Sequence, residues 1–383
     1  MKLLVATVSR SDFGILSTLI LSLNNYKKFD VRTLVTGEHF SKKMGKTFNE
    51  IRNKKIKINK KIKLKEFSSE PISILKKSSE IILKLTKYLK KNKPDLLILL
   101  GDKYETFMIS YCAFIQRIPI AHIHGGEKTA GSLDDTFRHQ ISKMSDIHFV
   151  EREVYKKRLV QLGENPKDIT ITGSLAKENL NKVSFASKKE IEKKFKIKFS
   201  NKNIIFTYHS ETNKTINKKK IFKIFSIIDN NPSIKFIITA PNLDIGSDYL
   251  RSIIKKKTKL KNVSYVKSFG QDYYFSVLNI VDGIIGNSSS GLIEVPALKK
   301  FTINIGNRQT GRFFEKTVIN CKDNHQSIQK SIKLAYSKKF QKILKNFKNK
   351  DSLKASKKIL NKINNFKYKN YRYKIFNDIN FNY

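Results

Sequence analysis

Short apolar runs alternate with segments of helical periodicity from the first residue to position 172. Runs of this kind are typical of strands that are buried on both faces of a parallel sheet. Strands are therefore predicted at residues 3–8, 31–35, 96–100, 118–123, 147–150 and 169–172. Helices are predicted at residues 15–23, 72–91, 107–116 and 136–144, and a turn at residues 10–14.

The same alternation restarts after a polar stretch, rich in Lys and Ser, that follows Gly173 and is predicted to be a linker with a charged helix. Further strands are predicted at 204–208, 234–239, 263–266, 283–285 and 301–305, and helices at 218–228 and 323–366. Two such sets predict an α/β protein with two Rossmann-like domains facing a central cleft. The expected domain limits are 1–178 and 179–365, followed by a basic, aromatic tail at 366–383.

The chain of 383 residues carries a formal net charge of +45, from 77 Lys and Arg against 32 Asp and Glu. An excess of this size is typical of nucleic-acid-binding proteins. Here it is mostly lysine and is spread along the whole chain, whereas the segments with candidate chemistry are acidic or mixed. We therefore expect no nucleic acid as a partner, and a positive field that helps to collect a phosphate-bearing substrate.

Cysteine content and hydropathy limit the class of protein further. Cys112 and Cys321 lie far apart and form neither a metal-binding pattern nor a disulfide framework. The first eight residues are too short and too strand-like for a signal peptide. No apolar run reaches the roughly 18 residues that a membrane span needs. These features predict a soluble, cytoplasmic protein with no membrane contact.

Asp102 is the first carboxylate after the predicted strand at 96–100, next to Gly101. Open α/β sheets bind their ligands at this edge, where their parallel strands end. Asp102 is either a catalytic group at the mouth of the cleft or the N-cap of the next helix, where aspartate satisfies free N–H groups. The residue alone leaves both interpretations open.

His122 and His124 alternate at the end of the next predicted strand, so they are expected to share one face of it. Glu127 follows after two glycines. Zinc is an alternative for this group, but no third ligand stands at a recognisable spacing, so proton transfer is favoured and no metal is expected. Asp134 and Asp135 follow at the start of a predicted helix, where they complement its dipole or act beside basic residues one turn on.

The second half of the chain places His209 at the end of the predicted strand 204–208. Further on, Ser288, Ser289 and Ser290 lie between two glycines, after an apolar strand and before a helix that carries Glu294. A strand, a turn of small residues and a helix start can hold phosphate on free N–H groups, although a serine-capped turn is the simpler alternative. Arg308 and Arg312 follow the next strand and can add charge-assisted contacts to a diphosphate.

Together these motifs resemble the hydrolysing UDP-N-acetylglucosamine 2-epimerases, especially the branch that serves sialic and legionaminic acid synthesis. The resemblance spans residues 3 to 320 and rests on ordered motifs at Arg10, 101–105, 122–127, 134–139, His209, 286–294 and the Arg308/Arg312 loop. It implies a two-domain fold of the glycosyltransferase B type, with no metal or redox cofactor. It also implies a nucleotide sugar as substrate.

The resemblance assigns roles by position. Asp102, Asp134 and His209 match the family's catalytic acids and bases. The positions that match its nucleotide-binding residues are Arg10, Ser288, Ser289, Ser290, Glu294 and Arg312. Many members carry a catalytic glutamate two places after the histidine that matches His122, and here that place is His124. Either His124 or Glu127 takes over this role.

The implied reaction is a hydrolysing 2-epimerisation of a UDP- or GDP-linked 2-acetamido sugar. A base removes the C2 proton, the nucleoside diphosphate leaves C1, and water adds to the glycal to give the free manno-configured sugar. The candidate substrates are UDP-N-acetylglucosamine, which gives N-acetylmannosamine, and a diacetamido-trideoxy analogue. A homodimer or larger homo-oligomer is expected. A glycosyltransferase of the same architecture is the main alternative, because fold does not fix function; a nucleic-acid-binding protein is supported only by the net charge.

Overall fold

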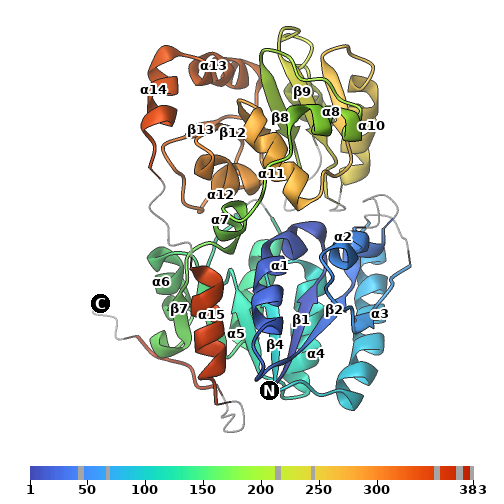
Figure 1. Ribbon diagram of the computed structural model, residues 1–383, viewed down its shortest axis with the longest axis vertical. Coiled ribbons are helices and arrows are strands. Elements are labelled where there is room, and N and C mark those ends of the chain that lie inside the picture. The colour runs from blue at the N-terminus through green and yellow to red at the C-terminus, as the bar shows by residue number, and fades with distance from the viewer. Residues whose placement is uncertain are drawn as a thin grey trace.

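The computed structural model describes residues 1–41, 47–65, 70–130, 132–211, 217–242, 246–348, 354–367 and 374–379. These residues form two lobes, each built on one parallel sheet, which lie one above the other in Figure 1. This arrangement confirms the predicted α/β class with two Rossmann-like units. Parts of the predicted helical region 323–366 and of the tail 366–383 lie outside the described residues.

The first lobe contains a seven-stranded parallel sheet in the order β3-β2-β1-β4-β5-β6-β7. Alternate residues of its strands belong to different cores: Leu3 and Val5 pack on one face, and Leu4 and Ala6 on the other. Both faces are therefore buried, which explains the nearly continuous apolar runs in the sequence. The strands are β1 (Lys2–Thr7), β2 (Asp30–Val35), β3 (Lys60–Lys61), β4 (Leu96–Leu100), β5 (Ile120–Ile123), β6 (Ile147–Val150) and β7 (Ile169–Ile171).

The first helix begins earlier than predicted. Residues 10–14, expected to form a turn, are the first residues of α1 (Arg10–Asn24). The Ser9 hydroxyl accepts a hydrogen bond from the backbone N–H of Asp12 and caps this helix directly after β1. The other helices of this lobe are α2 (Phe48–Asn53), α3 (Pro71–Lys91), α4 (Tyr104–Ile115), α5 (Asp134–Met144) and α6 (Glu153–Gln161), with short 3-10 turns at Gly37–Phe40 and Pro166–Asp168.

The second lobe contains a six-stranded parallel sheet in the order β10-β9-β8-β11-β12-β13. Its strands are β8 (Asn203–Thr207), β9 (Lys235–Thr239), β10 (Val263–Val266), β11 (Gly283–Gly286), β12 (Phe301–Ile305) and β13 (Val318–Cys321). The edge strand β13 was not predicted, because its burial is incomplete and its four residues show no clear pattern. The helices are α8 (Lys188–Phe195), α9 (Lys218–Phe225), α10 (Ser247–Lys257), α11 (Gln271–Ile280), α12 (Ser290–Ala297), α13 (His325–Ala335) and α14 (Lys338–Asn346).

The stretch after Gly173, predicted to be a polar linker, contains the expected charged helix α8 and also a buried one. This second helix, α7 (Leu175–Leu180), lies between the lobes in Figure 1. All six of its residues are buried, including Lys177, Glu178 and Asn179. Asn179 Nδ2 donates to the carbonyl oxygens of Gly14 and Ile15 at 2.7 and 3.0 Å. Glu178 accepts hydrogen bonds from the backbone N–H and the hydroxyl of Ser356, so polar groups of this segment have partners in the interior.

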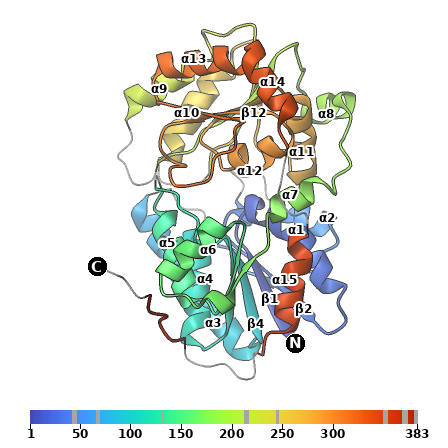
Figure 2. The ribbon, with the colours of Figure 1, turned by 90° about the vertical axis from the view of Figure 1, so that its left-hand side faces the viewer.

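The last helix, α15 (Ala355–Asn364), returns to the first lobe. Ala355, Ile359 and Ile363 are fully buried in the same core as Leu3 and Val5. Figure 2 shows the same packing from the side, with α15 next to α1. The chain therefore crosses between the lobes at α7 and again before α15. The domain limits drawn from the sequence remain a prediction.

The two sheets change direction at corresponding places. In the first lobe the chain reverses between the neighbouring strands β1 and β4, and in the second between β8 and β11. Ligands of open α/β sheets bind at the carboxyl ends of strands beside such a reversal. None of the described helices is long and apolar enough to cross a membrane.

Candidate active site

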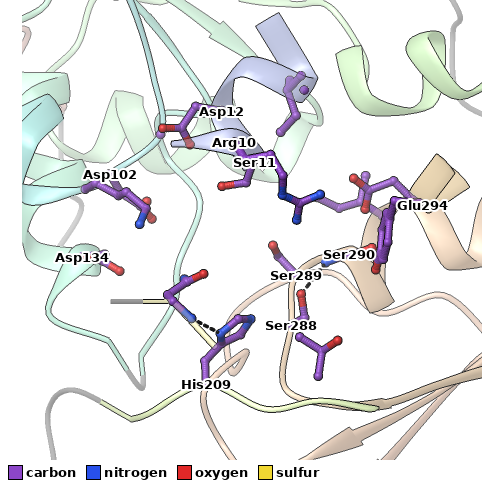
Figure 3. Close-up of a pocket in the computed structure, with 18 of the residues that line it drawn as sticks. Arg10, Ser11, Asp12, Asp102, Asp134, His209, Ser288, Ser289, Ser290 and Glu294 are labelled. Carbon is purple, nitrogen blue, oxygen red and sulfur yellow. Dashed lines mark hydrogen bonds between the residues drawn. The ribbon is translucent and has the colours of Figure 1, made fainter. Parts of the chain in front are cut away.

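A cavity of about 220 Å³ lies between the lobes and is lined by residues of both. Figure 3 shows Asp102 and Asp134 on one side, His209 and Ser288 on the other, and Arg10 pointing between them. All twelve residues selected from the sequence line this cavity: Arg10, Asp102, His124, Glu127, Asp134, His209, Ser288, Ser289, Ser290, Glu294, Arg308 and Arg312. The structure thus brings the selected residues together, while their individual roles remain predictions.

The four central segments of the site follow the strands at the two reversal points. Arg10 follows β1 and Asp102 follows β4, whereas His209 follows β8 and the three serines follow β11. Because parallel strands end at the same edge of a sheet, each lobe presents two of these segments to the cavity.

Asp102 is held by a buried arginine of α5. Arg138, whose side chain is 1% exposed, donates hydrogen bonds to Asp102 Oδ2 and, at 3.0 Å, to the hydroxyl of Thr129. The Arg138 guanidinium also lies 3.3 Å from Asp135 Oδ1. Asp134 accepts a hydrogen bond of 2.8 Å from the Ser132 hydroxyl. The acids at the start of α5 and the acid after β4 thus share one ordered network that leaves Asp102 at the cavity.

His122 and His124 do not play equivalent parts. β5 ends at Ile123, and His124 has a φ of +69°, so the strand alternation that predicted a shared face does not continue to His124. His122 is fully buried between the Gly101 carbonyl, 2.8 Å from Nε2, and the Ser142 hydroxyl, 3.0 Å from Nδ1. Burial lowers the pKa of His122 to about 3. His122 is therefore a neutral structural residue that joins β4, β5 and α5.

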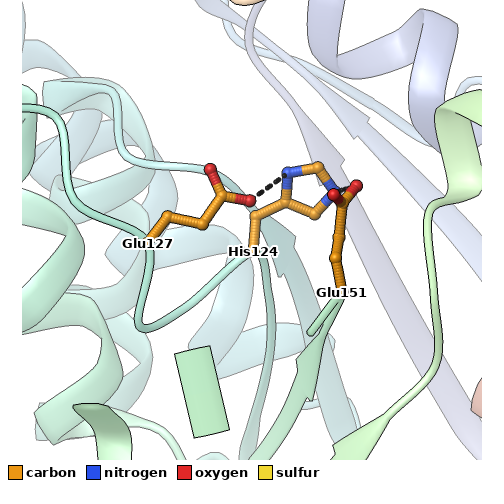
Figure 4. Close-up of side chains that lie close together, drawn as sticks. All are labelled: His124, Glu127 and Glu151. Carbon is orange, nitrogen blue, oxygen red and sulfur yellow. Dashed lines mark ion pairs between the residues drawn. The ribbon is translucent and has the colours of Figure 1, made fainter. Parts of the chain in front are cut away.

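His124 lies between two carboxylates, as Figure 4 shows. Its Nδ1 is 3.3 Å from Glu127 Oε1, and its Nε2 is 3.4 Å from Glu151 Oε1. The side chains of His124, Glu127 and Glu151 are 9%, 2% and 9% exposed. Gly126 makes the loop possible, because at its φ of +70° a Cβ would lie 2.3 Å from the carbonyl oxygen of Tyr155.

Glu151 was missed by the sequence analysis. It stands directly after β6, at the same edge of the sheet as Asp102 after β4. The rule that ligands bind at strand ends was sufficient to select it, but only the fold shows that it faces His124. Among the described residues, His124, Glu127 and Glu151 are also the group that can offer three ligand atoms to a metal ion, all within 4.8 Å of one another.

His209 has a fixed ring orientation. Its backbone exchanges two hydrogen bonds with the Asn287 side chain, of 2.7 and 2.9 Å. Its Nδ1 accepts a hydrogen bond of 3.2 Å from the backbone N–H of Asn242. Burial, reinforced by the charges of Arg308, Lys103 and Arg10, lowers the pKa of His209 well below its usual value. The ring is therefore neutral at pH 7, with its single proton on Nε2.

The serine turn opens α12, where the N-cap residue Ser289 makes no side-chain cap hydrogen bond and the Ser290 N–H has only a long contact of 3.4 Å to Ser288 Oγ. Gly286 permits this turn, because a Cβ there would lie 1.7 Å from the Thr207 carbonyl oxygen. The Ser290 hydroxyl lies 2.8 Å from the Tyr274 hydroxyl, and the Arg10 guanidinium lies 5.8 Å from the centre of the Tyr274 ring. Burial raises the pKa of Glu294, one turn into the helix, to about 7. N–H groups, hydroxyls and a cation on one side of the cavity suit a phosphate group.

The two arginines of the loop after β12 have protein partners. Arg308 donates to the Asn287 carbonyl oxygen at 3.2 Å, beside the serine turn. Arg312 crosses the cavity: its Nη2 lies 3.0 Å from Glu127 Oε2, and its Nε donates to the Thr129 hydroxyl at 3.4 Å. The loop therefore connects the serine turn with the Glu127 loop of the opposite lobe.

A family model and the sequence relatives identify the family of this chain. The family described as UDP-N-acetylglucosamine 2-epimerase matches residues 21–364. The chain is 35% identical to the GDP/UDP-N,N'-diacetylbacillosamine 2-epimerase (hydrolyzing) of Campylobacter jejuni, over 84% of this chain and 85% of the relative. It is 33% identical to the polysialic acid biosynthesis protein P7 of Escherichia coli, over 91% and 89% of the two chains.

A solved structure has the same fold along nearly its whole length. The UDP-GlcNAc 2-epimerase from Neisseria meningitidis, solved with UDP-GlcNAc bound, superimposes with a TM-score of 0.82 at 22% identity, and the match covers 95% of this chain and 99% of that one. The sequence relatives cover most of both chains, and the family match spans both lobes. The chain therefore belongs to the UDP-N-acetylglucosamine 2-epimerase family of enzymes.

Proposed function

We propose that this protein is a hydrolysing 2-epimerase, which converts a UDP- or GDP-linked 2-acetamido sugar into the free manno-configured sugar and the nucleoside diphosphate. The observation that supports it most strongly is a cavity between the lobes that is lined by acids and His124 of the first lobe and by His209 and the serine turn of the second. Relatives at 35% and 27% identity are named as hydrolysing diacetylbacillosamine 2-epimerases. UDP-N-acetylglucosamine and its diacetamido-trideoxy analogue are the substrates to test first.

The proposed mechanism assigns the nucleotide to the second lobe. The diphosphate binds the N–H groups and hydroxyls of residues 288–290, together with Arg10. Glu294, in the first turns of the same helix, is proposed to accept hydrogen bonds from the ribose. Arg308 and Arg312 supply further positive charge on this side. Neutral His209 carries its proton on Nε2 and is proposed to donate it as the diphosphate leaves C1.

The first lobe is proposed to handle the protons of the sugar. A base removes the C2 proton, the C1–O bond breaks, and a double bond forms between C1 and C2. Water then adds its oxygen to C1, and C2 receives a proton on the opposite face. These steps need groups on both faces of the ring, and the candidates are Asp102, Asp134 and one of His124 and Glu127.

Isotope incorporation separates this reaction from the alternatives. In deuterated water, the product of a 2-epimerase carries one deuterium at C2, because the proton that was removed is replaced from solvent. In oxygen-18 water, the label enters C1 of the sugar and not the diphosphate. A glycosyltransferase or simple hydrolase breaks only the C1–O bond and leaves the C2 hydrogen in place. An unlabelled C2, or a product of gluco configuration, would exclude the epimerase proposal.

Three further expectations from the sequence also stay proposals: a cytoplasmic location, assembly into a homodimer or larger homo-oligomer, and catalysis without a metal ion. Size-exclusion chromatography with light scattering measures the assembly. Metal analysis of the purified protein, together with activity before and after treatment with a chelator, tests the third expectation.

A further inference from the structure

Glu151 is a buried carboxylate for which the proposed reaction has no assigned task. Its side chain is 9% exposed, and its Oε1 has no hydrogen-bond partner, although this atom lies only 3.4 Å from Nε2 of His124. An unpaired buried carboxylate oxygen destabilises the folded state, so its retention beside a reactive side chain needs a physical reason.

The opposite side of the ring is more firmly held. Glu127 Oε1 faces Nδ1 of His124, and its other oxygen is held by Arg312 at 3.0 Å. Glu127 is thus fixed by a cation of the second lobe, whereas among the described residues no Lys or Arg lies within ion-pair distance of Glu151. A hydrogen bond from Nε2 to Glu151 restricts rotation of the His124 ring about its Cβ–Cγ bond, and in the neutral ring it leaves Nδ1, on the Glu127 side, without a proton.

We propose that Glu151 is a positioning residue: from the end of β6 it accepts the Nε2 proton of His124 and holds the ring in line with the cavity. The inference rests on the proposed function, because His124 has a task only if the sugar loses and regains a proton. His124 also has a φ of +69°, a backbone conformation that favours glycine, and residues held in such conformations concentrate at functional sites.

A metal ion is the competing interpretation of the same three side chains. The two ring nitrogens of a histidine point away from each other, and here each faces its own carboxylate. One ion could bind only one of these nitrogens, although one ligand atom from each of the three residues lies within 4.8 Å of the others. A hydrogen bond from Nε2 to Glu151 needs only a small reorientation of two groups that already lie 3.4 Å apart, so the geometry favours positioning over metal ligation.

The test begins with steady-state kinetics of the full-length protein. Glu151→Ala is expected to lower kcat by about tenfold or more, as loss of a supporting carboxylate commonly does, and to leave KM within about twofold. Glu151→Gln keeps the shape of the side chain and is the second variant if the alanine variant does not fold. Glu153→Gln, on an exposed glutamate two positions along, is the matched control and should behave as the wild type.

A double-mutant cycle shows whether Glu151 acts through His124. If it does, Glu151→Ala has little further effect on kcat once His124 has been replaced by alanine. The inference would be overturned if the two substitutions lowered kcat by independent factors that multiply. It would also be overturned if Glu151→Ala changed only KM, or changed neither kcat nor KM. So would a bound metal ion that is present in the wild type and lost from Glu151→Ala.

An NMR measurement that needs no turnover tests the role of Glu151 separately from the proposed function. Long-range proton–nitrogen NMR spectra report the state of each imidazole among the seven histidines, and His124→Ala assigns the signal in question. We expect Glu151→Ala to shift the His124 ring signals and to leave those of His209 in place. A wild-type protein that releases no nucleoside diphosphate from any sugar nucleotide would refute the function, whereas an unmoved His124 signal would refute the role of Glu151.

Discussion

Glu127 of the first lobe and Arg312 of the second form an ion pair across the cavity, with 3.0 Å between Oε2 and Nη2. The two side chains are only 2% and 12% exposed, so the pair is largely removed from water. Because Glu127 also faces His124, the position of the second lobe affects the side chains that are proposed to handle the sugar's protons.

We expect Arg312→Gln to lower kcat/KM by roughly ten- to a hundredfold, because a lost hydrogen bond between charged groups costs about 1.5–3 kcal/mol. Arg152→Gln is the matched control. Arg152 also reaches across the lobes, to Glu315 at 2.9 Å, but this pair is more exposed and does not include Glu127. A change of less than about fivefold is expected there. Equal losses in both variants would mean that lobe closure alone, and not the Glu127 contact, determines the rate.

Replacing Asp102 by asparagine should lower kcat by about two orders of magnitude or more, since general acids and bases typically contribute that much. Asparagine keeps an oxygen acceptor for Arg138, so the protein should remain folded, which circular dichroism and thermal melting check. Near-normal turnover would remove Asp102 from the mechanism and leave it as a structural partner of Arg138.

His209→Ala should reduce kcat by a similar factor, because it removes the proposed proton donor to the leaving group. Asn287→Ala is an informative companion: it removes the side chain that exchanges two hydrogen bonds with the His209 backbone, and leaves the imidazole present. We expect it to lose less activity than His209→Ala. The reverse ranking would show that the loop conformation matters more than the imidazole.

Burial raises the pKa of Glu105 from its usual value to about 7, against the lowering effect of Lys103 and with a further increase from Glu38. The folded protein therefore binds this proton more tightly than the unfolded chain. The resulting stabilisation is fully present below pH ~4.5 and is lost as the pH rises through about 7.

Glu105→Gln, a neutral replacement, should therefore raise the melting temperature at pH 8 and change it little at pH 4.5. At about 1.4 kcal/mol per pKa unit, the gain at pH 8 is of the order of 3 kcal/mol. Glu153→Gln, on an exposed side chain, should show no such pH dependence. A variant that is no more stable than the wild type at pH 8 would mean that Lys103 offsets the whole penalty of burying the charge.

The C-terminal tail stabilises the last turn of α5. Lys374 Nζ donates to the carbonyl oxygens of Ser142, Lys143 and Ser145 at 3.0, 3.0 and 2.7 Å, and it pairs with the buried Glu164. Lys374→Met should lower the unfolding free energy of the first lobe by roughly 1–3 kcal/mol, because it removes three hydrogen bonds and an ion pair. Thermal melting measures the loss, with exposed Lys367→Met as control. An unchanged melting temperature would show that the tail is dispensable.

The sequence predicted those elements whose residues are buried in a regular pattern. β1, β4, β5 and α3 were located within a few residues, because both faces of the strands and one face of the helix are apolar. The elements that were missed lack such a pattern. β3 has two residues, and α7 buries polar side chains whose partners come from elsewhere in the chain.

The residues of the site were likewise predicted where a strand marks them in the sequence, and their contacts were missed where only the packing of the fold creates them. Asp102, His209 and the three serines were found because each stands directly after a predicted strand. The Glu127–Arg312 pair joins residues that are 185 positions apart in the numbering, and only the packing of the two lobes brings them into contact. The same holds for Glu151, whose position after β6 was visible in the sequence while its contact with His124 was not.

The packing of α15 determines when the core of the first lobe can be completed during synthesis. The first lobe leaves the ribosome first, yet Ala355, Ile359 and Ile363 complete its core only when the chain is nearly finished. Until then, the apolar side of α1 that these residues cover is open to water throughout synthesis of the second lobe. A nascent chain that stops before residue 354 therefore presents this surface to chaperones and proteases, and only nearly full-length protein can close it.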